Sequence, residues 1–216
     1  MTRKPIRHVI WDWNGTLLDD VEHALSALNI LLRERDMPAL DRDTYREHFG
    51  FPVRDFYVHL GFDFAREDFV AVSESFIAHY KAAAASARTH AEAQPTMAAL
   101  ASANIQQSVL SAMELTMLRS MLQAHGLTGF LRHVRGLDHL HATSKVALGV
   151  ELMHTLGTPA SETLFVGDTL HDLETAEAMG CQCLLFVNGH QTRARLTAKG
   201  VRLINSLSEV LDAVLA

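Results

Sequence analysis

The order of apolar runs along the chain constrains its fold more than any other feature. One short run, residues 9–11, ends at Asp12 and is followed by a long stretch of helical periodicity without a strand pattern. From about residue 103 onward, short apolar runs alternate with amphipathic helices, which is the sequence form of βαβ units and a parallel sheet. The first strand therefore belongs to a sheet whose other strands lie in the C-terminal half, at residues 109–110, 134–137, 164–166, 184–187 and 201–204.

The stretch between the first strand and the later strands is predicted to be an inserted helical unit. Apolar residues recur there at helical spacing in four segments, which are residues 21–35, 41–49, 53–60 and 66–88. Four helices of this size bury their apolar stripes against one another without a sheet. We therefore predict an α/β protein with a doubly wound parallel sheet and an inserted four-helix cap, with core residues 1–19 and 89–216 and cap residues 20–88.

Composition excludes several classes of protein and partner. Hydrophobic residues make up 48% and charged residues 20% of the 216 residues, as in folded globular domains rather than disordered chains. Nineteen basic against 25 acidic residues give a net charge of −6, which disfavours a nucleic-acid partner. The apolar run near the N-terminus is too short for a signal sequence or a membrane span, so we expect a cytoplasmic protein without a membrane partner. The sequence predicts no particular oligomeric state.

Polar residues follow three of the predicted strands at the point where each strand ends. Asp12 follows the first strand, Ser111 the second and Asp168 the fourth. The carboxyl ends of parallel strands meet at one edge of a sheet, where such proteins bind their ligands. Asp172 adds another carboxylate four residues after Asp168, on the same side of a helical turn. These four residues are therefore candidates for a common site.

Their chemistry indicates metal and phosphate binding. Carboxylates that lie close together repel one another unless a cation joins them, and a donor set of oxygens alone suits Mg²⁺ together with a substrate phosphate. Ser111 is expected to open a helix whose free backbone N–H groups bind an anion together with the hydroxyl. Lys145, near the start of a predicted helix over residues 144–156, adds a positive charge. An acid, a metal, a helix N-terminus and a lysine together are typical of phosphoryl transfer.

Four segments of the chain resemble the motifs of one known superfamily. Residues 9–19, Val-Ile-Trp-Asp-Trp-Asn-Gly-Thr-Leu-Leu-Asp, are similar to the first motif of the haloacid dehalogenase-like phosphohydrolases. Ser111 matches the second motif, Lys145, 34 positions later, matches the third, and residues 167–172 match the fourth, whose Asp168 follows after another 23 positions. The resemblance covers residues 6–19 and about 104–190. The insert is similar, in position and helix pattern only, to the small C1-type cap of the phosphoglycolate phosphatase-like branch.

The resemblance implies a metal-dependent hydrolase. It implies that Asp12 is the nucleophile and forms an aspartyl-phosphate, which splits a difficult hydrolysis into two displacements. It assigns Mg²⁺ to Asp12, to the backbone carbonyl of Asn14 and to Asp168, with Asp172 close to the metal or to Lys145. The implied reaction is Mg²⁺-dependent hydrolysis of a small phosphorylated metabolite.

The resemblance also implies how the phosphoryl group is held. Ser111 and the backbone N–H of Ala112 would bind its oxygens, and Lys145 would offset the charge on the nucleophile and the phosphate. Arg54, in the predicted cap, is a further candidate for contact with the substrate.

Asn14 departs from the superfamily pattern. Phosphatases of this superfamily usually carry a second aspartate two residues after the nucleophile, which protonates the leaving group and then activates water. An amide has no titrating proton near neutral pH, so Asn14 cannot take this role, although its backbone carbonyl still binds a metal. Losing this general acid and base is expected to lower the rate on an ordinary alkyl phosphate by roughly 10²- to 10⁴-fold, which raises the barrier by about 3 to 5 kcal/mol.

The sequence leaves several explanations for Asn14 open. The first is a substrate whose leaving group needs no proton, such as an acyl phosphate or an anhydride. In the second, a histidine with a suitable pKa takes over proton transfer, and the candidates are His141, His171 and His190. In the third, the protein has lost rapid turnover and is a phosphate-binding or regulatory protein. A phosphonatase-like C–P hydrolase, which would need Lys81 of the predicted cap as a Schiff-base lysine, is a further alternative.

Overall fold

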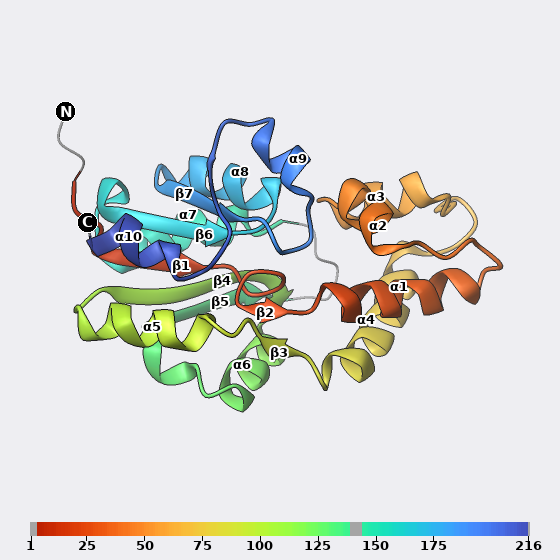
Figure 1. The fold of residues 1–216 in the computed structure, drawn as a ribbon. Helices are drawn as coiled ribbons and strands as arrows, with labels where there is room; N and C mark the ends of the chain where they lie inside the picture. The colour runs from red at the N-terminus through yellow and green to blue at the C-terminus, as the bar shows by residue number, and fades with distance from the viewer. Residues whose placement is uncertain (1–3, 139–143, 216) are drawn as a thin grey trace.

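The computed structural model describes residues 4–138 and 144–215, which contain a six-stranded parallel sheet (Figure 1). The strands lie in the order β5-β4-β1-β6-β7-β8. Their bounds are β1 (His8–Trp11), β4 (Gln106–Glu114), β5 (His133–Leu137), β6 (Thr163–Gly167), β7 (Gln182–Phe186) and β8 (Arg202–Ile204). The N-terminal strand pairs with β4 and β6 near the middle of the sheet, which confirms the predicted α/β fold and the place of the first strand.

Helices cover both faces of the sheet (Figure 1). One face packs against α5 (Ala93–Ser102), α6 (Leu115–Ala124) and α10 (Glu209–Leu215), and the other against α7 (Val146–Leu156) and α8 (Leu170–Met179). Alternate side chains of a strand point to opposite faces. Accordingly, Val9 and Trp11 join the cluster that contains Met97 of α5, whereas Ile10 joins Leu152 of α7, and all three β1 residues are fully buried.

Several short elements were not predicted from the sequence. Helix α5 is rich in alanine and has a weak apolar periodicity, and α9 (Arg193–Thr197) is barely longer than one turn. Two 3₁₀ turns, Thr128–Phe130 and Ala160–Glu162, precede β5 and β6. Elements of this length leave little periodic signal, because a pattern needs about 11 residues or more to be distinctive.

The helical insertion follows β1 directly, as predicted. It contains α1 (Val21–Arg33), α2 (Arg42–His48), α3 (Val53–Leu60) and α4 (Phe69–Ala84). The chain enters it through β2 (Leu18–Asp19) and leaves it through β3 (Arg88–Thr89), and these two strands pair antiparallel. Figure 1 shows the insertion beyond the end of the sheet where β1 stops, with α1 and α4 side by side. The division into a core and a cap at residues 19/20 and 88/89 stays a prediction.

Local signals set the ends of the inserted helices. Asp41 caps α2 by accepting a hydrogen bond from the backbone N–H of Thr44 at 2.7 Å. Asp68 caps α4 through the N–H of Ala71 at 3.2 Å, so this helix begins three residues later than predicted. Gly61 ends α3 in the left-handed conformation, with a φ of 103°, which glycine adopts without steric cost.

The insertion is joined to the core by hydrogen bonds to backbone carbonyls. The Arg46 guanidinium of α2 donates to the carbonyls of Val187, Gly189 and Gln191, at 2.7, 2.8 and 2.9 Å, in the loop after β7. In the other direction, Arg195 of α9 donates to the carbonyl of Phe49 at 2.6 Å. One arginine from each side thus satisfies carbonyls on the opposite part of the molecule.

Replacement of Arg46 tests this junction. Arg46→Met keeps the aliphatic stem but removes donors to three carbonyls, so we expect the free energy of unfolding to fall by about 1–3 kcal/mol. Chemical denaturation measures this change. Arg42→Met is the matched control on the same helix, because Arg42 pairs with the exposed Glu22 and the loss of such a surface pair should cost less than about 1 kcal/mol. Equal losses in the two variants would contradict the junction described here.

Candidate active site

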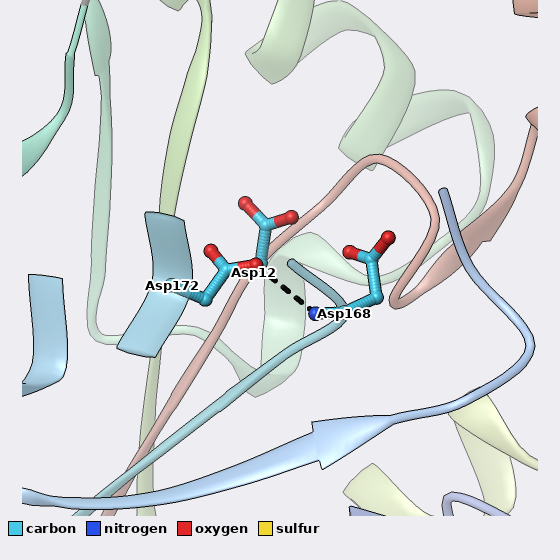
Figure 2. A group of neighbouring side chains, drawn as sticks. All are labelled: Asp12, Asp168 and Asp172. Carbon is cyan, nitrogen blue, oxygen red and sulfur yellow. Dashed lines mark hydrogen bonds between the residues drawn. The ribbon is translucent and has the colours of Figure 1, made fainter. Parts of the chain in front are cut away.

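Three carboxylates meet where β1 and β6 end. Asp12 follows β1, Asp168 follows β6, and Asp172 lies in the first turn of α8. One oxygen from each lies within 4.8 Å of the others, and all three side chains are buried (Figure 2). The sheet topology therefore brings Asp12 close to two acids that follow it by 156 positions or more in the sequence.

Asp168 is held in one orientation by the loops around it. Its Oδ1 accepts a hydrogen bond from the Thr16 hydroxyl at 2.8 Å, and its Oδ2 accepts one from the backbone N–H of His190 at 2.6 Å. Gly15 has a φ of +71°, and a Cβ at Gly15 or at Gly189 would collide with the Asp168 carboxylate. Both glycines are needed because backbone must approach this carboxylate closely.

Asp172 has two functions in the local structure. One oxygen, Oδ2, accepts hydrogen bonds from the N–H groups of Asp168 and Thr169 at 3.0 and 2.8 Å, the former drawn as a dashed line in Figure 2, and thereby caps α8. Its other oxygen lies 2.6 Å from Nζ of Lys145. The capping interaction therefore aims the second oxygen at the lysine.

Lys145 connects two of the carboxylates. Its ammonium is buried and pairs with both Asp12 and Asp172. Burial lowers the pKa of Lys145, but these two carboxylates outweigh it and raise the pKa above its ordinary value. Lys145 is therefore positively charged at and around neutral pH.

One ammonium does not balance three buried carboxylates. Burial raises the pKa of Asp12 well above its ordinary value, Lys145 opposes this, and Asp172 and Asp168 add to it. Burial also raises the pKa of Asp168 to about 6. Burial and mutual repulsion thus disfavour the ionised carboxylates. A hard divalent cation bound to their oxygens would stabilise the ionised forms of Asp12, Asp168 and Asp172. The residues present therefore fit a magnesium-type site.

A second polar cluster lies next to this site and centres on Asp20. Asp20 stands at the N-cap position of α1, but its side chain does not cap this helix. Instead the buried carboxylate accepts hydrogen bonds from Nδ2 of Asn14 at 2.7 Å, from the N–H of Gly15 at 2.7 Å and from the Tyr80 hydroxyl at 2.6 Å. Asn14 also donates to Tyr80 at 2.8 Å. Two consecutive acids, Asp19 and Asp20, were the only sequence signal for this cluster.

His190 completes the Asp20 cluster. Its Nε2 lies 3.2 Å from Oδ1 of Asp20 and its Nδ1 lies 2.8 Å from the Tyr45 hydroxyl of α2. Burial lowers the pKa of His190, but the Asp20 carboxylate opposes this and the pKa rises to about 9. Both ring nitrogens are thus occupied, and the imidazolium neutralises Asp20.

The predicted phosphate-binding residues Ser111 and Ala112 lie in β4, the strand that pairs with β1, and their setting needs one correction. Ser111 is buried in β4, and Ala112 lines the cavity described below. The prediction that Ser111 opens a helix is wrong, because β4 continues to Glu114 and α6 begins at Leu115. The side chain of Glu114 caps α6 by accepting from the N–H groups of Thr116 and Met117, so these donors are not free for an anion.

Other predicted residues do not line the cavity. The His171 ring accepts a hydrogen bond from the backbone N–H of Lys145 at 3.3 Å and stacks on Phe51 at 4.7 Å. The Arg54 side chain is exposed and lies over the Phe64 ring at 5.1 Å, and Lys81 is exposed on α4. His141 lies outside the described residues.

A cavity of about 140 Å³ opens between the insertion and the core. The core contributes Asp12, Lys145 and Asp172 to its wall, and the insertion contributes side chains from all four of its helices. Asp12 and Asp172 of the carboxylate cluster therefore face a cavity of the size of a small molecule.

Comparison with known proteins identifies the family. The haloacid dehalogenase-like hydrolase family model matches residues 9–186, so the chain belongs to this family. This confirms the resemblance that the four motifs indicated. The chain is 28% identical to a probable phosphatase, IndB, of Dickeya dadantii, over 97% of this chain and 93% of that protein. It is 25% identical to a phosphoglycolate phosphatase of Photorhabdus laumondii, over 87% and 82% of the two chains.

Solved structures show the same fold. A haloacid dehalogenase-like family protein of Streptococcus pneumoniae superimposes with a TM-score of 0.82 at 20% identity, over 96% of this chain and 98% of that one. A predicted phosphatase of Clostridium acetobutylicum gives a TM-score of 0.81 at 17% identity, over 98% and 99%. None of the helices in residues 4–138 and 144–215 has the length and apolar content to cross a membrane.

The His190–Asp20 pair predicts a pH dependence of stability. The pKa of His190 is about 9 in the folded protein and about 6.5 in an unfolded chain, so the pair stabilises the fold fully below pH 6.5. In metal-free protein we expect the free energy of unfolding to decline as pH rises from 6.5 through 9. Denaturation at a series of pH values measures the slope, which His190→Gln should flatten. An unchanged slope in this variant would contradict the assigned charge.

Proposed function

We propose that the protein is a Mg²⁺-dependent phosphohydrolase that acts on a small phosphorylated metabolite through an aspartyl-phosphate on Asp12. The observation that carries this proposal is the buried cluster of Asp12, Asp168 and Asp172 joined to Lys145, at the end of a cavity of ligand size. Membership of a hydrolase family and the phosphatase names of its relatives support it.

Asp12, Asp168 and the backbone carbonyl of Asn14 would hold the Mg²⁺, and Asp172 would lie next to them. When bound, the ion supplies charge neutralisation at the phosphoryl oxygens and keeps the clustered carboxylates ionised. Ser111 and the N–H of Ala112 would bind phosphoryl oxygens. Lys145 would offset the negative charge that the nucleophile and the phosphate bring together.

The reaction takes two displacements. An Asp12 oxygen attacks phosphorus, and the bond to the leaving oxygen breaks with its electron pair on that oxygen. Water then attacks the phosphorus of the aspartyl-phosphate, which releases inorganic phosphate and restores the Asp12 carboxylate. The water gives up one proton to the products, so atoms and charges balance.

No proton donor for the leaving group is evident among the described residues of the site. Asn14 has no titrating proton, and its amide is directed at Asp20 and Tyr80. Both ring nitrogens of His190 already have partners, and His171 lies outside the cavity wall. Among the explanations for Asn14, these contacts favour a substrate whose leaving group needs little or no proton. We propose that His190 keeps Asp20 and the loop around Asp168 in position.

We propose that residues 20–88 act as a cap that closes the cavity and selects the substrate. Tyr80 of α4 and Tyr45 of α2 reach the polar cluster at Asp20 and His190, so the cap contacts the site directly. Excluding water from such a site strengthens its electrostatic interactions and protects the intermediate. No observation favours the alternative of a phosphonatase-like C–P hydrolase, because Lys81 is exposed and absent from the cavity wall.

Several relatives are named phosphoglycolate phosphatases, and their substrate carries a carboxylate besides the phosphate. A buried carboxylate needs a cation as partner. The cations in the described cavity wall are Lys145, which two aspartates occupy, and His190, which Asp20 occupies. We therefore do not propose phosphoglycolate as the substrate.

Replacement of the nucleophile tests the proposed function. Asp12→Asn keeps the size of the side chain but removes the attacking carboxylate, so Mg²⁺-dependent hydrolysis of acetyl phosphate or para-nitrophenyl phosphate should fall by at least about 10³-fold. Release of inorganic phosphate with Mg²⁺ and with a chelator measures this. Asp43→Asn, an exposed aspartate of α2, is the control and should retain full activity. Full activity of the Asp12 variant would reject the mechanism, and no activity in the parent protein would favour a binding or regulatory role.

Exchange of two side chains tests the role of Asn14. The double variant Asn14→Asp, Asp20→Asn keeps an amide facing a carboxylate but puts the acid at position 14. We expect hydrolysis of alkyl phosphates to rise by up to roughly 10²- to 10⁴-fold, with a smaller gain on acetyl phosphate, which needs no proton. The single Asn14→Asp variant should gain less, because two carboxyls within hydrogen-bond distance share one proton. An unchanged ratio of alkyl to acetyl phosphate rates in the double variant would contradict this role.

A further inference from the structure

The wall of the cavity beyond the carboxylates is strongly apolar, which phosphate hydrolysis alone does not require. Half-buried apolar side chains face it from both parts of the molecule, and they are Phe49, Phe51, Val53, Phe76, Ile77 and Met117. Three buried aromatic residues, Tyr45, Phe56 and Tyr57, also line the cavity. Binding of an apolar ligand removes such apolar surface from water, which favours the complex.

The charged groups in the described wall leave no free cation to bind a second anionic group of a substrate. Lys145 pairs with Asp12 and Asp172, and His190 pairs with Asp20. Glu114, the remaining charged residue in the described wall, caps α6. An anionic substituent that entered the cavity would lose its hydration without gaining a cation as partner. The wall therefore selects against a second negative charge.

We propose that the substrate is an aryl phosphate, the phosphate ester of a small phenol, whose ring lies among these apolar side chains while its phosphoryl group lies at Asp12. This inference rests on the phosphohydrolase function proposed above. The cavity volume of about 140 Å³, part of which the phosphoryl group would take, limits the ring to a small one. The aromatic rings of the wall also favour another ring at 4.5–7 Å between centroids.

The absence of a proton donor points independently to the same class of substrate. When Asp12 attacks, the phosphorus–oxygen bond of an aryl phosphate breaks with its electron pair on a phenolate, which then takes its proton from water. A phenol has a pKa of about 10, against about 15.7 for water, so phenolate leaves far more readily than an alkoxide. Asn14 is thus no obstacle to the first displacement when the leaving group is a phenol.

Two aryl phosphates of similar leaving-group acidity test the inference. Phenyl phosphate carries a bare ring, and 4-carboxyphenyl phosphate adds a charge at the far end of the ring. We expect the parent protein to hydrolyse phenyl phosphate with a kcat/KM at least about tenfold higher, mainly through KM, because the carboxylate finds no partner. Values within threefold of each other would overturn the inference.

A charge placed in the wall should reverse this preference. Val53 lines the cavity at the start of α3 and is half-buried, so an arginine there can keep contact with solvent. Val53→Arg should lower kcat/KM for phenyl phosphate and raise it for 4-carboxyphenyl phosphate, shifting the ratio by at least about tenfold. Val58→Arg is the matched control, because Val58 is 50% exposed on the same helix and absent from the wall. A structural defect would lower both rates together, and an unchanged ratio in Val53→Arg would overturn the inference.

Acetyl phosphate separates the two proposals. It has no ring and needs no proton, so it reports the Asp12 chemistry alone. Mg²⁺-dependent turnover of acetyl phosphate without a preference for phenyl phosphate would overturn the aryl phosphate assignment and leave the phosphohydrolase function standing. No turnover of any of the three compounds would overturn both.

Discussion

The buried ion pairs of Lys145 with Asp12 and Asp172 are the interaction on which the rest of the site depends. Removing charged groups from water is costly, and it is tolerated only where partners are close and well oriented. Each neighbouring feature supplies such orientation. Asp172 is aimed by its capping of α8, and Asp168 is held by the Thr16 hydroxyl and the His190 backbone. Three carboxylates against one ammonium still leave an excess of negative charge, which suits a divalent cation.

The Asp20 cluster links the insertion to this site. Asp20 receives hydrogen bonds from Asn14 in the loop after Asp12 and from Tyr80 on α4, and His190 joins it to Tyr45 on α2. Asn14, which has no titrating proton for catalysis, therefore donates a hydrogen bond that holds Asp20 in place. A change at Asn14 alters the partner of a buried carboxylate as well as the chemistry, which is why a compensating change at Asp20 is needed to test its role cleanly.

The acidity of the leaving group and the shape of the cavity are separate physical constraints on the substrate. The first follows from side chains near phosphorus, where neither Asn14 nor His190 offers a free proton. The second follows from apolar residues further out, on the insertion. Family membership constrains neither, because relatives at identities of 24–28% do not reveal which side chains line the cavity of this protein. The substrate class that we propose therefore rests on the cavity wall, most of which the insertion supplies.

The sequence by itself determined the α/β class, the helical insertion and the place of Asp12 at the end of the first strand, because apolar periodicity and residues at strand ends are local signals. Four separated motifs also indicated Asp168, Asp172 and Lys145. Tertiary structure alone decided the role of Asp20, the engagement of both nitrogens of His190 and the exclusion of Arg54 from the cavity wall. It also corrected Ser111, since pairing with β5 extends β4 to Glu114. These features depend on contacts between residues up to 170 positions apart, which no local pattern encodes.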